Sequence, residues 1–81
     1  MGRHVDTQRA AVGRAVRDLR SARGMSQEDL AFVTGMHRTY VGGVERGERN
    51  PTLIALSRVA SALGVRPWEL LLRAEELERS E

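Results

Sequence analysis

Apolar residues recur every three or four positions along most of the chain, which is the spacing of one face of an α-helix. The first stretch with this pattern runs from about Thr7 to Arg23 and places Val12, Val16 and Leu19 on one face. Gly24 follows as a helix stop. No segment alternates apolar and polar residues convincingly, so the pattern predicts an all-α protein.

A second, short helix is expected after this stop. Ser26 is a favourable N-cap residue, and the segment Ser26-Gln27-Glu28-Asp29 resembles a capping box with Asp in place of the usual Glu. The helix should end near Thr34, because Gly35 adopts left-handed backbone without steric cost.

A third helix is expected from about His37 to Arg46, with Gly47 as its stop. Val41 and Val44 lie three residues apart and would anchor one of its faces to the core. Helix, short glycine-containing turn and helix together form a helix-turn-helix, here over about residues 27–46.

Two further helices complete the predicted fold. Thr52 caps the fourth helix, whose core stripe comprises Leu53, Leu56, Ala60 and Leu63. Gly64 ends it, and Pro67 is suited to the first turn of a fifth helix over about residues 67–78. The stripe of the fifth helix that can cover the core comprises Pro67, Leu70, Leu71, Ala74 and Leu77.

The length of 81 residues suffices for one domain, and 41% hydrophobic residues indicate a globular one. We expect a flexible arm over residues 1–8 and a folded domain over residues 9–78. Cysteine is absent, and no apolar run reaches the roughly 18 residues of a membrane span. We therefore expect a cytoplasmic protein with no membrane partner.

Charge is distributed unevenly along the chain. Residues 1–68 hold eleven Arg and six acidic residues, whereas residues 69–81 hold two Arg and five Glu. All basic residues are Arg, whose planar fork of donors suits phosphates and guanine edges, although a GC-rich genome explains this bias equally well. The first part of the chain could therefore face a polyanion.

Catalytic chemistry finds no support in the sequence. The Ser and Thr residues form no plausible nucleophile, base and orienting set, and the Glu residues near the C-terminus have no pocket to shift their pKa values. Two distant His without Cys do not make a metal site. We expect no enzymatic activity, no metal and no cofactor.

The stretch SQEDLAFVTGMHRTYVGGVERGERNPT resembles the Xre/Cro-type, phage-repressor-like helix-turn-helix family. Its Gly-x-His-Arg-Thr-Tyr-Val…Glu-Arg-Gly-Glu-Arg-Asn core is similar to the controller proteins of restriction–modification systems. The resemblance covers about residues 12–72. It implies a compact five-helix domain that binds double-stranded DNA.

The resemblance also assigns roles to individual residues. Arg38 and Thr39 match base-reading positions at the start of the recognition helix. The positions expected to contact the DNA backbone or to sense its shape are Gln27, His37, Tyr40, Gly42, Gly43, Arg46 and Arg49. Taken alone, His37 is better explained as a residue that only begins the helix, and Tyr40 could equally serve packing.

Other positions have structural roles or depart from the family pattern. Arg20 and Glu45 match a pair that forms a partly buried salt bridge between the first and third helices. Gly42 and Gly43 stand where the family usually has a polar side chain, which lets the helix approach DNA closely but leaves fewer side chains for bases. Phe32 is expected to pack beside Tyr40.

Trp68 and Leu72 lie four residues apart and off the core stripe of the fifth helix, so a second protomer is expected to cover them. The alternative is that Trp68 folds over the fourth helix.

The chain is thus predicted to be a homodimeric transcription regulator on a near-palindromic operator, acting as repressor or activator with RNA polymerase as a possible partner. Two alternatives remain: an antitoxin-type repressor that also binds a toxin, and a protein–protein adaptor that lost DNA binding.

Overall fold

The computed structural model describes the backbone of residues 2–80 and the side chains of residues 6–80. Within this part of the chain the fold is all-α, as predicted. Its five helices are α1 (Gly2–Ala22), α2 (Gln27–Thr34), α3 (Arg38–Glu45), α4 (Leu53–Ala62) and α5 (Pro67–Arg79). Among the described residues, no helix combines the length and the apolar composition that a membrane span requires.

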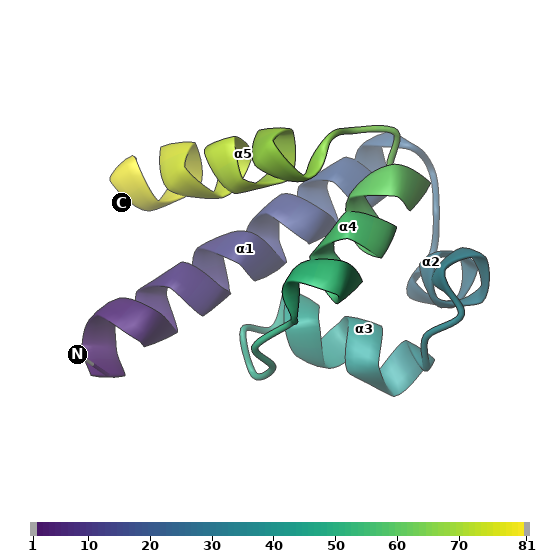
Figure 1. The fold of residues 1–81 in the computed structure, drawn as a ribbon, viewed down its shortest axis with the longest axis horizontal. Helices are drawn as coiled ribbons and strands as arrows, with labels where there is room; N and C mark the ends of the chain where they lie inside the picture. The colour runs from purple at the N-terminus through teal and green to yellow at the C-terminus, as the bar shows by residue number, and fades with distance from the viewer. Residues whose placement is uncertain (1, 81) are drawn as a thin grey trace.

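Helices α1 and α5 lie side by side and α4 packs against α5 and α2, while α2 and α3 pack against each other away from α5 (Figure 1). The start of α1 and the end of α5 lie on the same side of the molecule, away from α2. The core that joins the helices is built from small and medium apolar side chains. Its buried members are Ala11, Ala15, Val16, Leu30, Ala31, Val41, Val44, Val59, Ala60, Leu63, Leu70 and Ala74.

The ends of α2 follow from local chemistry. The backbone N–H of Asp29 donates to Ser26 Oγ at 2.9 Å, and the Ser26 N–H donates to the Asp29 carboxylate at 2.9 Å, so the predicted capping box is confirmed. At the other end Gly35 has a φ of 73°, and its backbone N–H donates to carbonyls of the preceding turn. The helix-turn-helix therefore has a fixed start and a fixed turn.

The capping box makes a testable pH prediction. The Ser26 backbone N–H, and to a smaller extent its side chain, lower the pKa of Asp29 by hydrogen bonding to the carboxylate. The stabilisation is thus complete above the ordinary Asp pKa of about 3.9 and is lost as pH falls through the lower value of the folded state. Urea titrations should show wild type exceeding Asp29→Asn in stability near neutral pH, with a gap that narrows in acid. A gap independent of pH would contradict this assignment.

The first helix begins earlier than the sequence indicated. Residues 1–8 were expected to form an arm, but α1 already starts at Gly2 and runs without a break to Ala22. No proline interrupts this stretch, and Asp6 and Arg9 form an ion pair at the i,i+3 spacing that favours a helix. The predicted start near Thr7 was therefore wrong by more than one helical turn.

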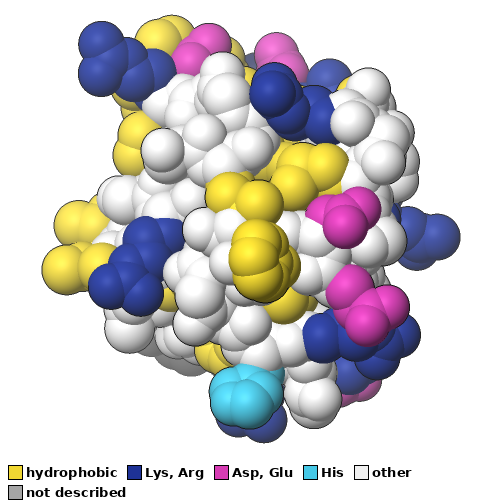
Figure 2. Space-filling model, turned by 90° about the vertical axis from the view of Figure 1, so that its right-hand side faces the viewer, with side chains coloured by type: hydrophobic (Ala, Val, Ile, Leu, Met, Phe, Trp, Pro, Cys, Tyr) yellow, Lys and Arg dark blue, Asp and Glu magenta, His cyan; other side chains and the backbone are white. Residues whose placement is uncertain are grey.

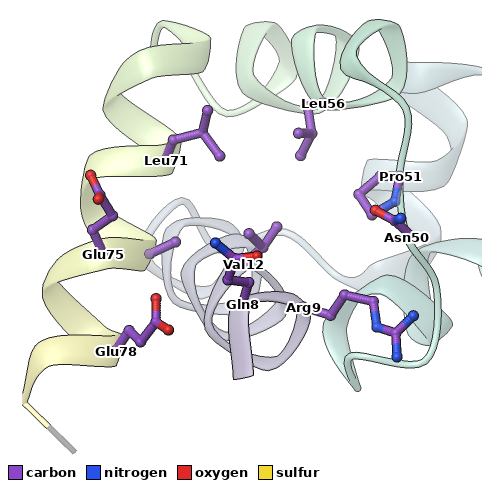
Figure 3. Close-up of a pocket in the computed structure, with 10 residues that line it drawn as sticks. Gln8, Arg9, Val12, Asn50, Pro51, Leu56, Leu71, Glu75 and Glu78 are labelled. Atoms are coloured by element: carbon purple, nitrogen blue, oxygen red, sulfur yellow. The ribbon is translucent and has the colours of Figure 1, made fainter. Parts of the chain in front are cut away.

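The core stripe of α5 also needs one correction. Leu70 and Ala74 are buried as expected, but Leu71 is 40% exposed. Leu71 instead lines a groove of about 530 Å³ between α1, α5 and the start of α4, where it points toward Leu56 (Figure 3). Leu71 therefore lies beside the groove and outside the buried core, so the apolar face of α5 is narrower than a five-residue stripe.

Helices α1 and α3 pack unusually closely at one glycine. A Cβ placed on Gly13 would lie 2.4 Å from the carbonyl oxygen of Val44 and 2.5 Å from that of Glu45. These contacts are with backbone, which cannot move aside as a flexible side chain can. Gly13 thus sets the position of the C-terminal end of α3 against α1, a role that helical periodicity in the sequence did not reveal.

Candidate nucleic-acid interface

Helix α3 has one face in the core and its first turn in solvent. Val41 and Val44 are buried, whereas Arg38 and Thr39 are exposed. His37 is the N-cap residue, but its side chain makes no capping hydrogen bond. The helix therefore presents a cation, a hydroxyl and an uncapped N-terminus from one end, all of which suit a polyanion.

A buried ion pair fixes α3 to the first helix. Arg20 Nε donates to Glu45 Oε2 at 2.6 Å and its Nη2 donates to Glu45 Oε1 at 3.0 Å, while its Nη1 donates to the carbonyl oxygen of Met25 at 2.7 Å. The Glu45 side chain is only 3% exposed. Its hydrogen bonds raise the pKa of Arg20 above the ordinary value, against the opposing effect of burial. These contacts join α1, α3 and the connection between α1 and α2.

Gln27 belongs to the same network. Its side-chain amide donates to Glu45 Oε1 at 3.0 Å, so the first residue of α2 is tied to the last residue of α3. Gln27 is half-buried and faces α3, whereas the sequence had suggested an outward phosphate contact. Its observed contact joins the two helices of the helix-turn-helix directly.

The two glycines of α3 are covered by side chains of the protein itself. A Cβ on Gly42 would meet Arg46 Nη1 at 2.9 Å, and one on Gly43 would meet Arg49 Cγ at 2.8 Å. Arg46 also pairs with Glu48, Nε to Oε2, at 3.1 Å, in an exposed position. Both arginines therefore fold back along α3 instead of extending away from its end.

The expected contact between Phe32 and Tyr40 is not formed. Phe32 is 88% exposed and Val33 is also exposed, whereas Tyr40 is partly buried against the core. Phe32 follows a buried turn of α2, and its position on the helix directs it away from the core. Figure 2 shows apolar side chains in the middle of the face that carries α2, with acidic side chains beside them.

Exposed apolar residues at the start of α4 escaped the sequence interpretation. Leu53 was assigned to a core stripe, but Leu53 and Ile54 are 69% and 66% exposed. Both lie directly after the Thr52 cap, where the helix has just begun and α5 no longer covers it. The sequence feature that could have indicated their exposure is the position of this apolar pair immediately after the N-cap residue.

The sequence model of the helix-turn-helix family HTH_3 matches residues 16–70. This range includes the C-terminal part of α1 and all of α2, α3 and α4. The chain belongs to this helix-turn-helix family. It is a DNA-binding transcription regulator of the helix-turn-helix type.

Several members of the helix-turn-helix family are similar over most of their length. The control protein C.BamHI of Bacillus amyloliquefaciens is 47% identical over 64 residues, covering 78% of this chain and 79% of the relative. The control protein C.SmaI of Serratia marcescens is 50% identical over 58 residues, covering 72% and 69%. The crystal structure of the restriction–modification controller protein C.AhdI from Aeromonas hydrophila superposes with a TM-score of 0.75 at 50% identity, covering 76% and 94%.

Proposed function

We propose that the chain is a homodimeric controller protein of a restriction–modification system that binds a near-palindromic operator. The observation that carries the proposal is the solvent-exposed first turn of α3, held on a helix whose other face is buried and ion-paired. The likeness to control proteins over most of their length supports the biological setting.

In this proposal the first turn of α3 enters the major groove. Arg38 donates to guanine O6 and N7, and Thr39 contacts a thymine methyl or a phosphate. Arg46 and Arg49 contact phosphates on either side, and His37 and Tyr40 lie along the DNA backbone. Gln27 acts indirectly, because its amide is engaged by Glu45.

The proposed dimer face lies on α4 and α5. Trp68 is 62% exposed and Leu72 is 43% exposed on α5, and Leu53 and Ile54 are two further exposed apolar side chains at the start of α4. So many large apolar side chains are unusual on the surface of a small monomer. A two-fold dimer would place two recognition helices about 34 Å apart, which is one turn of the DNA.

Replacing Trp68 with Ala should weaken dimerisation by about 2 kcal/mol or more, because an exposed Trp at an interface is a typical hot spot. Sedimentation equilibrium should then show monomers at concentrations where wild type is dimeric. Phe32→Ala removes an aromatic ring that is even more exposed, on α2, and serves as the control, with no change in dimerisation expected. An unchanged association constant for Trp68→Ala would refute this interface.

Binding selection from random duplex DNA tests the whole proposal. A homodimer should enrich one sequence with two-fold symmetry, whose half-sites are about 10 base pairs apart from centre to centre. Its affinity should fall log-linearly with salt concentration. Recovery of no preferred sequence, together with affinity insensitive to salt, would favour an adaptor that binds only proteins.

An antitoxin-type repressor is a second candidate, and the exposure of Phe32 and Val33 favours it. These side chains lie on α2, whereas the residues of the proposed dimer face lie on α4 and α5. A toxin that covered them would co-purify in a fixed ratio from the native host. Phe32→Asp would abolish that association while leaving operator binding intact.

A further inference from the structure

The middle of α3 lacks side chains of its own. After Arg38, Thr39 and Tyr40, the next residues on the outer side of the helix are Gly42 and Gly43. Glycine destabilises a helix more than any other residue except proline. Yet both glycines are buried in the structure. Something other than their own side chains therefore covers the centre of the recognition helix.

Arg49 covers Gly43. Its Cγ lies 2.8 Å, its Nε 3.5 Å and its Cδ 3.7 Å from the place where a Cβ of residue 43 would be. The aliphatic stem of Arg49 thus rests directly on the helix backbone. An alanine at this position would occupy the same space, so the Arg49 side chain would have to rotate away.

The loop that carries Arg49 is held in place at two points. The backbone N–H of Glu48 donates to the carbonyl oxygen of Gly43 at 2.8 Å. Gly47 has a φ of 75° and lies against α1, where an added Cβ would approach Ala10 Cα to 3.0 Å. The Cα of Arg49 is therefore fixed near α3, and the missing side chain at Gly43 decides where its guanidinium can go.

We propose that Gly43 is a positioning residue for DNA binding: it seats Arg49 across the centre of α3, so that an arginine from the following loop supplies the phosphate contact that the helix itself lacks. Gly42 acts in the same way on Arg46, whose Nη1 lies 2.9 Å from the corresponding Cβ position. This inference rests on the proposed function. It replaces the interpretation in which the glycines act only by admitting DNA closely to bare backbone.

The two glycines should differ in the size of their effect. At Gly42 the nearest atom is the terminal Nη1 of Arg46, which can move by a small rotation. At Gly43 it is Cγ, near the base of the Arg49 side chain, so the whole side chain must move. Gly42→Ala is therefore a matched comparison that alters the same helix and should perturb binding less.

The test uses the full-length protein and a duplex carrying the sequence recovered by selection. At 0.1 M salt, Gly43→Ala should lower affinity by about tenfold for each protomer and reduce the salt slope by about 0.9 for each protomer, because each loses one phosphate contact. Its melting temperature should be no lower than that of wild type, because alanine favours a helix over glycine. Ser21→Ala, exposed on α1, controls for a gain in helix propensity elsewhere.

A double-mutant cycle identifies the mechanism. In the Arg49→Ala background, Gly43→Ala should have no further effect on affinity, because the side chain that it displaces is already gone. Equal losses in both backgrounds would mean that the added methyl group meets DNA directly, and would overturn the proposal, as would an unchanged affinity for Gly43→Ala alone. If wild type itself bound no preferred duplex, the proposed function would fail first, before any variant was compared.

Discussion

Replacing Arg20 with methionine should lower the free energy of unfolding by about 3–5 kcal/mol, the usual consequence of removing one partner of a buried ion pair. Glu45 is almost fully enclosed and receives two hydrogen bonds from Arg20, so the variant would leave its carboxylate with Gln27 as the remaining side-chain donor. A domain of this size has a total stability of roughly 5–15 kcal/mol. Urea denaturation followed by circular dichroism would measure the loss.

The double variant Arg20→Met/Glu45→Leu provides the control. It removes both charges and replaces them with apolar side chains of similar size, which is often neutral or stabilising at buried ion pairs. We therefore expect it to recover most of the stability lost in Arg20→Met. Equal destabilisation of the single and double variants would show that shape, and not the stranded charge, limits the stability of this contact.

Replacing Arg38 with alanine should reduce binding to the selected operator and remove the preference for one base in each half-site. A bidentate arginine–guanine contact contributes about 1–3 kcal/mol of discrimination, and each protomer of the proposed dimer would lose one. The helix should keep its place, because Arg38 is exposed and α3 is anchored by Val41, Val44 and Glu45. Competition binding with each base substituted in turn measures the preference.

Arg46→Ala is the matched control for this experiment, because it removes the same charge from the other end of α3. It should weaken binding to every sequence by a similar factor and flatten the salt dependence. Arg38→Ala with unaltered base preference would overturn the assignment of the first turn of α3 to the major groove. Loss of preference in Arg46→Ala alone would instead place the base contact at the C-terminal end of the helix.

Features that depend on neighbouring residues were predictable from the sequence. The capping box at Ser26 and the left-handed turn at Gly35 form within a few residues, so local chemistry determines them. The start of α1 was not predictable in this way, because no N-cap residue or proline marks it. The exposed positions of Leu53 and Leu71 depend on where α4, α5 and α1 cross, which periodicity within one helix cannot show.

In the candidate interface, too, local features were predictable from the sequence and tertiary contacts were not. The exposure of Arg38 and Thr39 follows from the burial of Val41 and Val44 on the other face of the same short helix. The contact of Gln27 with Glu45 and the coverage of Gly43 by Arg49 join residues that are separated along the chain or lie on different elements. Such contacts are set by tertiary packing, and a glycine in a helix does not reveal what will occupy its free space.

The close contact at Gly13 affects which half-site spacing the proposed dimer can bind. Because the carbonyl oxygens of Val44 and Glu45 rest on the backbone of α1, α3 cannot slide along that helix. Helix α1 in turn packs along α5, which carries Trp68 of the proposed dimer face. The two recognition helices of the dimer would then be held at one fixed separation. If the spacer between the two half-sites had a different length, the DNA would have to bend or twist to fit. Affinity would therefore vary with the stiffness of base pairs that the protein never touches.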